Sequence, residues 1–175
     1  MAKNIEIKAT LDDVIFSIET AKKLSGSAPQ ILKQTDYFFN CESGRLKLRV
    51  FDSDSGELIF YTREDGCDPK PSEYFISITQ EPAKLLRVLG ESHGIKGIVE
   101  KTRKLFLTGR TRIHIDQVVD LGDFIEFEVV LSDGEDKDTG IKEAHQLMEL
   151  FKIEQSNLID CAYIDLLDRN CYRNN

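Results

Sequence analysis

Residues 109–116, G-R-T-R-I-H-I-D, alternate charged with apolar side chains. Because successive side chains of a β-strand point to opposite faces, this pattern predicts a strand with one apolar face and one ionic face. The same alternation occurs in I-E-I-K at 5–8, L-K-L-R at 46–49 and I-E-F-E-V at 125–129. Four predicted strands therefore share an unusual feature, a densely charged face.

The chain also contains an internal repeat. G-R-x-K-x-R at 44–49 matches G-R-x-R-x-H at 109–114, an offset of 65 residues (109 minus 44). Turn residues and hydrophobic periodicity predict the order strand, helix, three strands, twice over. Strands are expected near 3–9, 31–40, 44–52, 56–63, 73–79, 96–107, 110–119 and 123–131, with a loop at 65–72 and later helices over 141–151 and 158–167. Two such halves predict an α+β fold, an eight-stranded and mostly antiparallel β-barrel with helices packed outside.

Composition sets further limits. The chain has 175 residues, of which 41% are hydrophobic and 31% charged, and we expect one domain over residues 1–170 with a disordered tail at 171–175. The net charge of −8 argues against binding to nucleic acids or acidic membranes. With no stretch of the length that spans a bilayer and no apolar signal region, we expect a cytoplasmic protein, either a monomer or a homodimer.

The direction of the charged faces separates two hypotheses. In an ordinary antiparallel sheet they face water, whereas in a closed barrel they line a tunnel for a highly charged ligand. Two observations favour the tunnel. The amphipathic helices need the apolar strand faces as partners, and the bases and acids segregate by strand instead of mixing.

A basic surface that faces an acidic one suits a polyphosphate bound to a metal ion. Arginine and lysine neutralise phosphoryl oxygens, and carboxylates hold hard cations such as Mg²⁺ or Mn²⁺. The metal draws charge from the leaving group as the phosphorus–oxygen bond breaks.

Eight short strings, taken in their order along the chain, match the pattern of a known family. They are N-I-E-I-K at 4–8, Q-T-D-Y-F-F at 34–39, L-K-L-R at 46–49, G-E-L-I-F-Y at 56–61, E-K-T-R at 100–103, G-R-T-R-I-H-I-D at 109–116, L-G-D-F-I-E-F-E at 121–128 and Y-I-D-L-L at 163–167. With them the chain resembles the CYTH superfamily of triphosphate tunnel metalloenzymes, and within it the class IV adenylyl cyclase branch. The resemblance covers nearly the whole chain and implies an eight-stranded antiparallel barrel and an enzyme.

The resemblance also implies three sets of site residues. The triphosphate-binding residues would be Lys8, Lys47, Arg49, Arg63, Lys101, Arg103 and Arg112. The ligands of Mg²⁺ or Mn²⁺ would be Glu6, Glu126 and Glu128. The catalytic residues would be Glu126, Asp116 and Arg110, where Asp116 orients a base or a metal-bound water and Arg110 lies close to the triphosphate.

Two residues leave alternatives open. Asn4 stands where the family signature E-x-E-x-K has its first glutamate, so a neutral oxygen either weakens one metal site or lies at the tunnel mouth without a catalytic role. His114 lies on the ionic face, where it acts either as a general base or through an orienting hydrogen bond.

Three functions follow from these residues. The first is adenylyl cyclase, in which the ribose 3′-oxygen of ATP attacks the α-phosphorus to give cyclic AMP and pyrophosphate. The second is a triphosphatase that hydrolyses tripolyphosphate or thiamine triphosphate. The third is a non-catalytic module that binds a nucleotide or polyphosphate.

Overall fold

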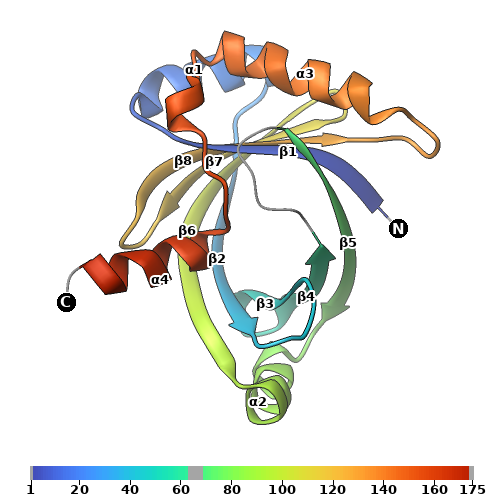
Figure 1. Ribbon diagram of the computed structural model, residues 1–175, viewed down its shortest axis with the longest axis vertical. Coiled ribbons are helices and arrows are strands. Elements are labelled where there is room, and N and C mark those ends of the chain that lie inside the picture. The colour runs from blue at the N-terminus through green and yellow to red at the C-terminus, as the bar shows by residue number, and fades with distance from the viewer. Residues whose placement is uncertain (1, 63–68, 174–175) are drawn as a thin grey trace.

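Strands and helices alternate in two similar halves in the computed structural model, which describes residues 2–62 and 69–173 (Figure 1). The first half contains β1 (Ala2–Thr10), α1 (Val14–Ser25), β2 (Gln30–Phe39), β3 (Arg45–Asp52) and β4 (Ser55–Thr62). The second contains β5 (Lys70–Thr79), α2 (Pro82–His93), β6 (Ile95–Thr108), β7 (Thr111–Val118) and β8 (Gly122–Val130). The chain ends with α3 (Lys137–Leu150), a 3₁₀ turn at Gln155–Asn157 and α4 (Tyr163–Arg173). The predicted order of strand, helix and three strands is confirmed in both halves.

The strands form a closed barrel in the order β1-β5-β4-β3-β2-β6-β7-β8. Every neighbouring pair is antiparallel. The first strands of the two halves, β1 and β5, pair with each other, and so do the second strands, β2 and β6. The two halves of the internal repeat therefore join through these two strand pairs to close the barrel. The predicted α+β barrel is confirmed.

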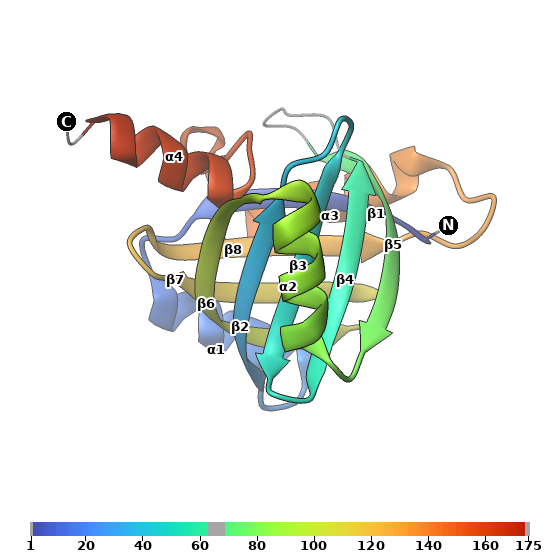
Figure 2. The same ribbon diagram turned by 90° about the horizontal axis from the view of Figure 1, so that it is seen from below.

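The helices cover the outside of the barrel. In Figure 1, α1 and α3 lie together on one side and α2 lies on the opposite side, and Figure 2 shows α2 lying over the strands β2, β3 and β4. The apolar strand faces point toward α1 and α3, and their buried side chains form a core with both helices. The core includes Ile7, Phe106, Ile113, Phe127 and Phe151. Because the apolar faces are outside, the charged faces of the same strands point into the barrel.

Two glycines let helices approach the strands closely. A Cβ atom on Gly140 of α3 would lie 2.7 Å from Ile5 and 2.8 Å from Leu131. A Cβ atom on Gly97 of β6 would lie 2.4 Å from Ile164 of α4. A larger residue at Gly140 would crowd both Ile5 and Leu131, whereas at Gly97 it would meet the tip of the Ile164 side chain, which would have to turn aside.

Two expected boundaries are wrong. Strand β5 begins at Lys70, although its neighbour Pro71 favoured a loop, because a proline is tolerated in the first residues of a strand. The last helix begins at Tyr163 and not at 158, since Leu158 forms a β-bridge with Ala9. This helix continues to Arg173, so residues 171–173 of the expected tail are helical.

Among the residues that the structure describes, no helix has the length and apolar character needed to cross a membrane.

Candidate functional site

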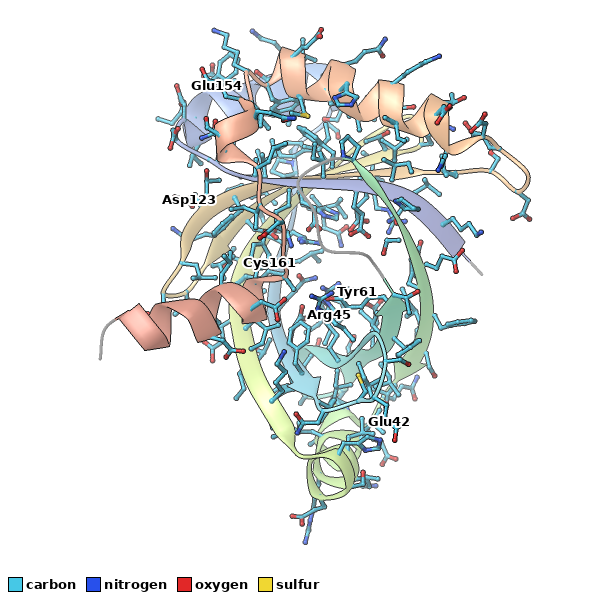
Figure 3. All side chains as sticks on the ribbon, viewed as in Figure 1. Glu42, Arg45, Tyr61, Asp123, Glu154 and Cys161 are labelled. Carbon is cyan, nitrogen blue, oxygen red and sulfur yellow. The ribbon has the colours of Figure 1, made fainter. Side chains whose placement is uncertain are left out.

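A cavity of about 280 Å³ lies inside the barrel and is lined by side chains of all eight strands. The view of Figure 3 looks into this ring of strands, where Arg45 and Tyr61 are labelled. The polar and charged lining residues are Asn4, Glu6, Lys8, Gln34, Asp36, Lys47, Arg49, Glu57, Ser72, Lys101, Arg103, Arg112, His114, Glu126 and Glu128. The alternative of an ordinary sheet with its charges in water is therefore wrong for these strands.

Three bases of the cavity converge on one buried carboxylate, that of Asp36 on β2. Arg49 donates from Nε to Asp36 Oδ1 at 2.8 Å and from Nη2 to Oδ2 at 3.0 Å. Lys47 and Lys101 each donate from Nζ to the same Oδ2 at 3.0 Å. We call Lys47, Arg49 and Lys101 the basic wall. Asp36 is 1% exposed, and its carboxylate neutralises part of the positive charge of the basic wall.

Burial and charge act in opposite directions on these groups. Burial would raise the pKa of Asp36, but Arg49, Lys101 and Lys47 hold that pKa well below its ordinary value of 3.8. Burial lowers the pKa of Lys101 to about 7, although Asp36 raises it. Burial and the neighbouring Arg49 lower the pKa of Lys47 to about 8. Both lysines of the basic wall therefore titrate close to neutral pH.

Acidic side chains gather on the opposite side of the cavity, on β1 and β8. Glu6 pairs in register with Glu128, and His114 of β7 pairs with Glu126. In the closed strand order, β1 and β8 lie opposite β2 and β3. We call Glu6, Glu126 and Glu128 the acidic wall. The basic wall therefore faces an acidic wall across the cavity, but the predicted segregation of charges is incomplete, because Lys8, Arg103 and Arg112 lie beside the carboxylates.

Cations surround Glu126 of the acidic wall and hold this carboxylate in its charged form. Arg103 donates to Glu126 Oε2 at 2.9 Å, and Lys8 Nζ lies 3.9 Å from Oε1. Burial would raise the pKa of Glu126, but Lys8, His114 and Arg103 hold this pKa well below its ordinary value of 4.5. Arg112 Nη1 lies 3.4 Å from Glu128 Oε2.

Asp116 lies behind the cavity surface and is not among its lining residues. It accepts two hydrogen bonds from Arg103, at 2.7 Å from Nε and 2.6 Å from Nη2. Tyr163 of α4 donates a third, at 3.1 Å. Asp116 therefore orients Arg103, and its expected role toward a base or a water stays a prediction.

The C-terminal segment closes one end of the barrel. The ring of Tyr163 lies under Lys8, whose Nζ is 4.1 Å from the ring centroid. Asp165 of α4 accepts from Arg45 at 3.0 Å and from Lys96 at 3.3 Å. These contacts attach α4 to β3 and β6 at the edge of the cavity.

Arg110, like Asp116, is not among the lining residues of the cavity. Arg110 lies in the turn between β6 and β7 and donates to Glu143 of α3 at 2.9 Å and to Glu135. Gly109 before it has φ 55°, so the turn directs Arg110 outward toward α3, and its expected place close to a triphosphate is not supported by this geometry. Arg63, expected to bind the triphosphate, lies outside the described residues.

Asn4 is inside the cavity, 2% exposed, and its Oδ1 accepts no hydrogen bond from the described residues. Asn4 was expected either at a metal site or at the tunnel mouth, and its burial argues against a position at the mouth. Gln34 Oε1, in the same cavity, has no partner there either. Buried polar atoms are normally paired, so the cavity offers acceptors for a ligand.

Comparison with known proteins places this arrangement in a family. The family model described as the CYTH domain matches residues 2–163. The chain belongs to the CYTH family. A Methanocaldococcus jannaschii protein named "putative adenylate cyclase" is 25% identical over 169 residues, which cover 93% of this chain and 97% of the relative. The resemblance seen in the sequence is therefore confirmed.

Solved structures show the same CYTH fold. The Pyrococcus horikoshii protein PH1012 superposes with a TM-score of 0.77 at 20% identity, covering 93% of this chain and 98% of that one. A Vibrio parahaemolyticus protein described as a putative adenylate cyclase has a TM-score of 0.77 at 15% identity, covering 94% and 97%. A Hippeastrum protein described as a putative adenylyl cyclase with a dominant triphosphatase activity has a TM-score of 0.62 at 12% identity, covering 95% and 96%.

The sequence did not identify two residues of this CYTH cavity. Asp36 stands in the string Q-T-D-Y-F-F, and its place in the phase of Gln34 and Phe38 was the signal that it faces inward. Tyr163 lies in α4, which follows the barrel strands in the sequence, so the alternating pattern of the strands could not predict that it reaches the cavity.

Proposed function

We propose that this protein is a metal-dependent enzyme that acts on a triphosphate, and that it converts ATP to cyclic AMP and pyrophosphate. The observation that carries the proposal is the basic wall that faces the acidic wall across one cavity of a CYTH barrel. The M. jannaschii relative, which matches nearly the full length of this chain, supports the cyclase reaction by its name.

The basic wall is suited to bind phosphoryl oxygens. Arg49, Lys47 and Lys101 come from two strands and point to one spot, where Asp36 holds them. A triphosphate that enters the cavity meets these donors already oriented, which reduces the entropy lost on binding. Arg103 and Arg112 extend the row of cations toward the acidic wall.

The acidic wall fits a divalent cation. One ligand atom from each of His114, Glu126 and Glu128 lies within 4.8 Å of the others. His114 Nδ1 is buried and has no hydrogen-bond partner among the described residues, as expected of a nitrogen reserved for a ligand. Glu6 lies beside Glu128 and would add a further oxygen. A metal bound there would offset the negative charge that develops on the leaving phosphate.

The residues of the chain supply the remaining requirements of the reaction. The cations of the basic wall fix the triphosphate chain along the cavity and neutralise its oxygens. Arg103 is held by Asp116, which Tyr163 holds in turn, so the position of Arg103 does not depend on the substrate. Side chains of the C-terminal segment cover one end and limit the access of water, which competes with the ribose 3′-oxygen as nucleophile.

The test is an assay of purified protein with ATP and, separately, tripolyphosphate, each with Mg²⁺ or Mn²⁺ and with a chelator control. Cyclic AMP and pyrophosphate in equal amounts from ATP are expected. Inorganic phosphate without cyclic AMP would instead identify a triphosphatase. Tight binding without any product would identify a binding module.

The triphosphatase is the second candidate because the Hippeastrum protein, which shares the fold, is described as having a dominant triphosphatase activity. The two reactions need the same cavity and differ in which phosphorus the nucleophile reaches. The binding module rests on Asn4, a neutral residue in place of the first glutamate of the signature.

The two buried lysines predict a pH dependence of anion binding. An anion favours the ammonium form, so tripolyphosphate binding without metal should take up protons and weaken as pH rises past the pKa values of about 7 for Lys101 and about 8 for Lys47. The affinity should fall by up to about tenfold per pH unit for each lysine that loses its proton. Calorimetry in buffers of different ionisation enthalpy measures both the affinity and the proton uptake.

Arginine variants provide the control. Because arginine stays charged, Lys101→Arg should flatten the pH profile, whereas Lys33→Arg on the outside of β2 should leave it unchanged. An affinity that is constant from about pH 6.5 to 9 in the unmodified protein would mean that neither lysine titrates in the site.

A further inference from the structure

His114 has a ring nitrogen, Nδ1, that has no hydrogen-bond partner among the described residues although it lies inside the charged cavity. Its side chain, on β7, is 3% exposed. Its Nδ1 lies 3.8 Å from Glu126 Oε2 and 3.6 Å from Glu128 Oε1, both beyond hydrogen-bond distance. Buried ring nitrogens normally form a hydrogen bond or bind a metal, so this one requires an explanation.

We propose that His114 is a metal ligand through Nδ1, together with Glu126 and Glu128, and that this centre takes a first-row transition metal such as Mn²⁺ in preference to Mg²⁺. The inference rests on the metal-dependent function proposed above and adds the identity of a ligand and the class of metal.

The separations of these atoms support a shared metal. Two neighbouring ligands of a six-coordinate ion with bonds of about 2.1 Å lie about 3 Å apart. The 3.6 and 3.8 Å separations are slightly longer, so small side-chain movements would bring Nδ1 and the two carboxylates to one ion. A direct pair between imidazole and carboxylate would instead have closed to about 2.8 Å.

The nearby cations oppose the binding of a free metal ion. Arg112 approaches Oε2 of Glu128 and leaves Oε1 toward His114, whereas Oε2 of Glu126, the oxygen nearest to His114, already accepts from Arg103 and would be shared with the metal. Their positive charge, with that of Lys8, lowers the affinity for a free cation. A bound triphosphate neutralises these bases, so metal and triphosphate should each strengthen the binding of the other.

The donor set determines the choice of metal. Mg²⁺ prefers oxygen ligands and gives up water reluctantly, whereas transition metals accept imidazole nitrogen readily. A centre of three carboxylates would suit Mg²⁺ well. The nitrogen donor that His114 adds to these carboxylates moves the preference toward Mn²⁺.

The chain offers a clean assignment because it contains only three histidines. His93 at the end of α2 and His145 on α3 are both exposed, whereas His114 is in the cavity. A nitrogen signal at a bound metal can therefore be assigned by labelling histidine and by replacing each histidine in turn.

The experiment is pulsed electron paramagnetic resonance of Mn²⁺ bound to the full chain, alone and with a methylene-bridged triphosphate analogue that cannot be cleaved. We expect modulation from one ¹⁴N nucleus, which changes to the ¹⁵N pattern when the protein is labelled with ¹⁵N-histidine. His93→Gln and His145→Gln should keep the signal. His114→Gln should lose it and bind Mn²⁺ about tenfold or more weakly, with little change for Mg²⁺.

The outcomes separate this inference from the proposed function. Bound Mn²⁺ without any histidine nitrogen would overturn the role of His114 and leave a metal enzyme with oxygen ligands only. Absence of Mn²⁺ binding even with the analogue would overturn both. Since labelling needs no substitution, the unmodified protein decides the question even if His114→Gln does not fold.

Discussion

Replacing Glu126 with glutamine is expected to abolish turnover of ATP or tripolyphosphate while the barrel remains folded. Glutamine keeps the shape of the side chain but removes the negative charge that faces Lys8, Arg103 and His114. A neutral amide is a poor ligand for a hard divalent cation. Loss of a metal contribution of several kcal/mol lowers the rate by at least about a thousandfold. Product formation at saturating metal and substrate measures the effect.

Glu143→Gln is the matched control for this prediction. Glu143 also binds an arginine, Arg110, but does so outside the barrel. The control should therefore keep its rate, and both variants should keep the circular dichroism spectrum of the parent. Turnover by Glu126→Gln at the parental rate, or turnover that persists in excess chelator, would contradict the metal-dependent mechanism.

Replacing Asp36 with asparagine should produce the largest change in stability. The substitution leaves the buried Lys101 and the partly buried Lys47 and Arg49 without their shared carboxylate, and such a loss costs about 3–5 kcal/mol in the free energy of unfolding. The melting temperature should fall by about 2–4 °C for each kcal/mol lost. Tripolyphosphate should then raise the melting temperature of the variant more than that of the parent, because the anion neutralises the unpaired bases.

The pH dependence of this loss has a defined sign. The pKa of Asp36 is held below its ordinary value of 3.8 in the folded protein, so its contribution to stability is complete above that value and disappears as pH falls. The difference in stability between parent and Asp36→Asn should therefore shrink in acid. Denaturant melts at several pH values measure it.

Asp165→Asn supplies the same chemical change at a surface site. Asp165 also contacts two cations, Arg45 and Lys96, but water reaches this side chain. Its loss should cost less than about 1 kcal/mol. Equal effects of the two substitutions, or a stable Asp36→Asn variant, would show that the convergence on Asp36 does not stabilise the cavity.

The alternating pattern identified most of the cavity because the direction of a side chain in a strand is a local property. Lys47, Arg49, Glu126 and Glu128 all face inward as their phase predicted. The same pattern failed at Arg110, since a strand end is set by the turn before it. Gly109 adopts positive φ, the strand begins at Thr111, and the alternation does not extend to Arg110.

Contacts between strands could not be predicted in this way. Asp36 meets bases from β3 and β6, and His114 meets carboxylates of β8, so both sites depend on the barrel order. A pattern read along one strand says nothing about which strand lies opposite. The string around Asp36 was recognised, but the three bases around its carboxylate follow from the closed sheet alone.

Closure between β1 and β8 links the folding of the chain to the assembly of its site. Asn4 pairs with Val130, and Lys8 pairs with Glu126. During synthesis, β1 can therefore form this pairing only after β8, the last strand of the barrel, has left the ribosome. Pairing over so long a stretch of sequence is slow, and β1 meanwhile presents an unpaired edge that invites aggregation. The same late step brings Lys8 and Glu6 beside the carboxylates of β8. A nascent chain that lacks β8 therefore has only Glu6 of the acidic wall, and the proposed metal centre can form only when the barrel is complete.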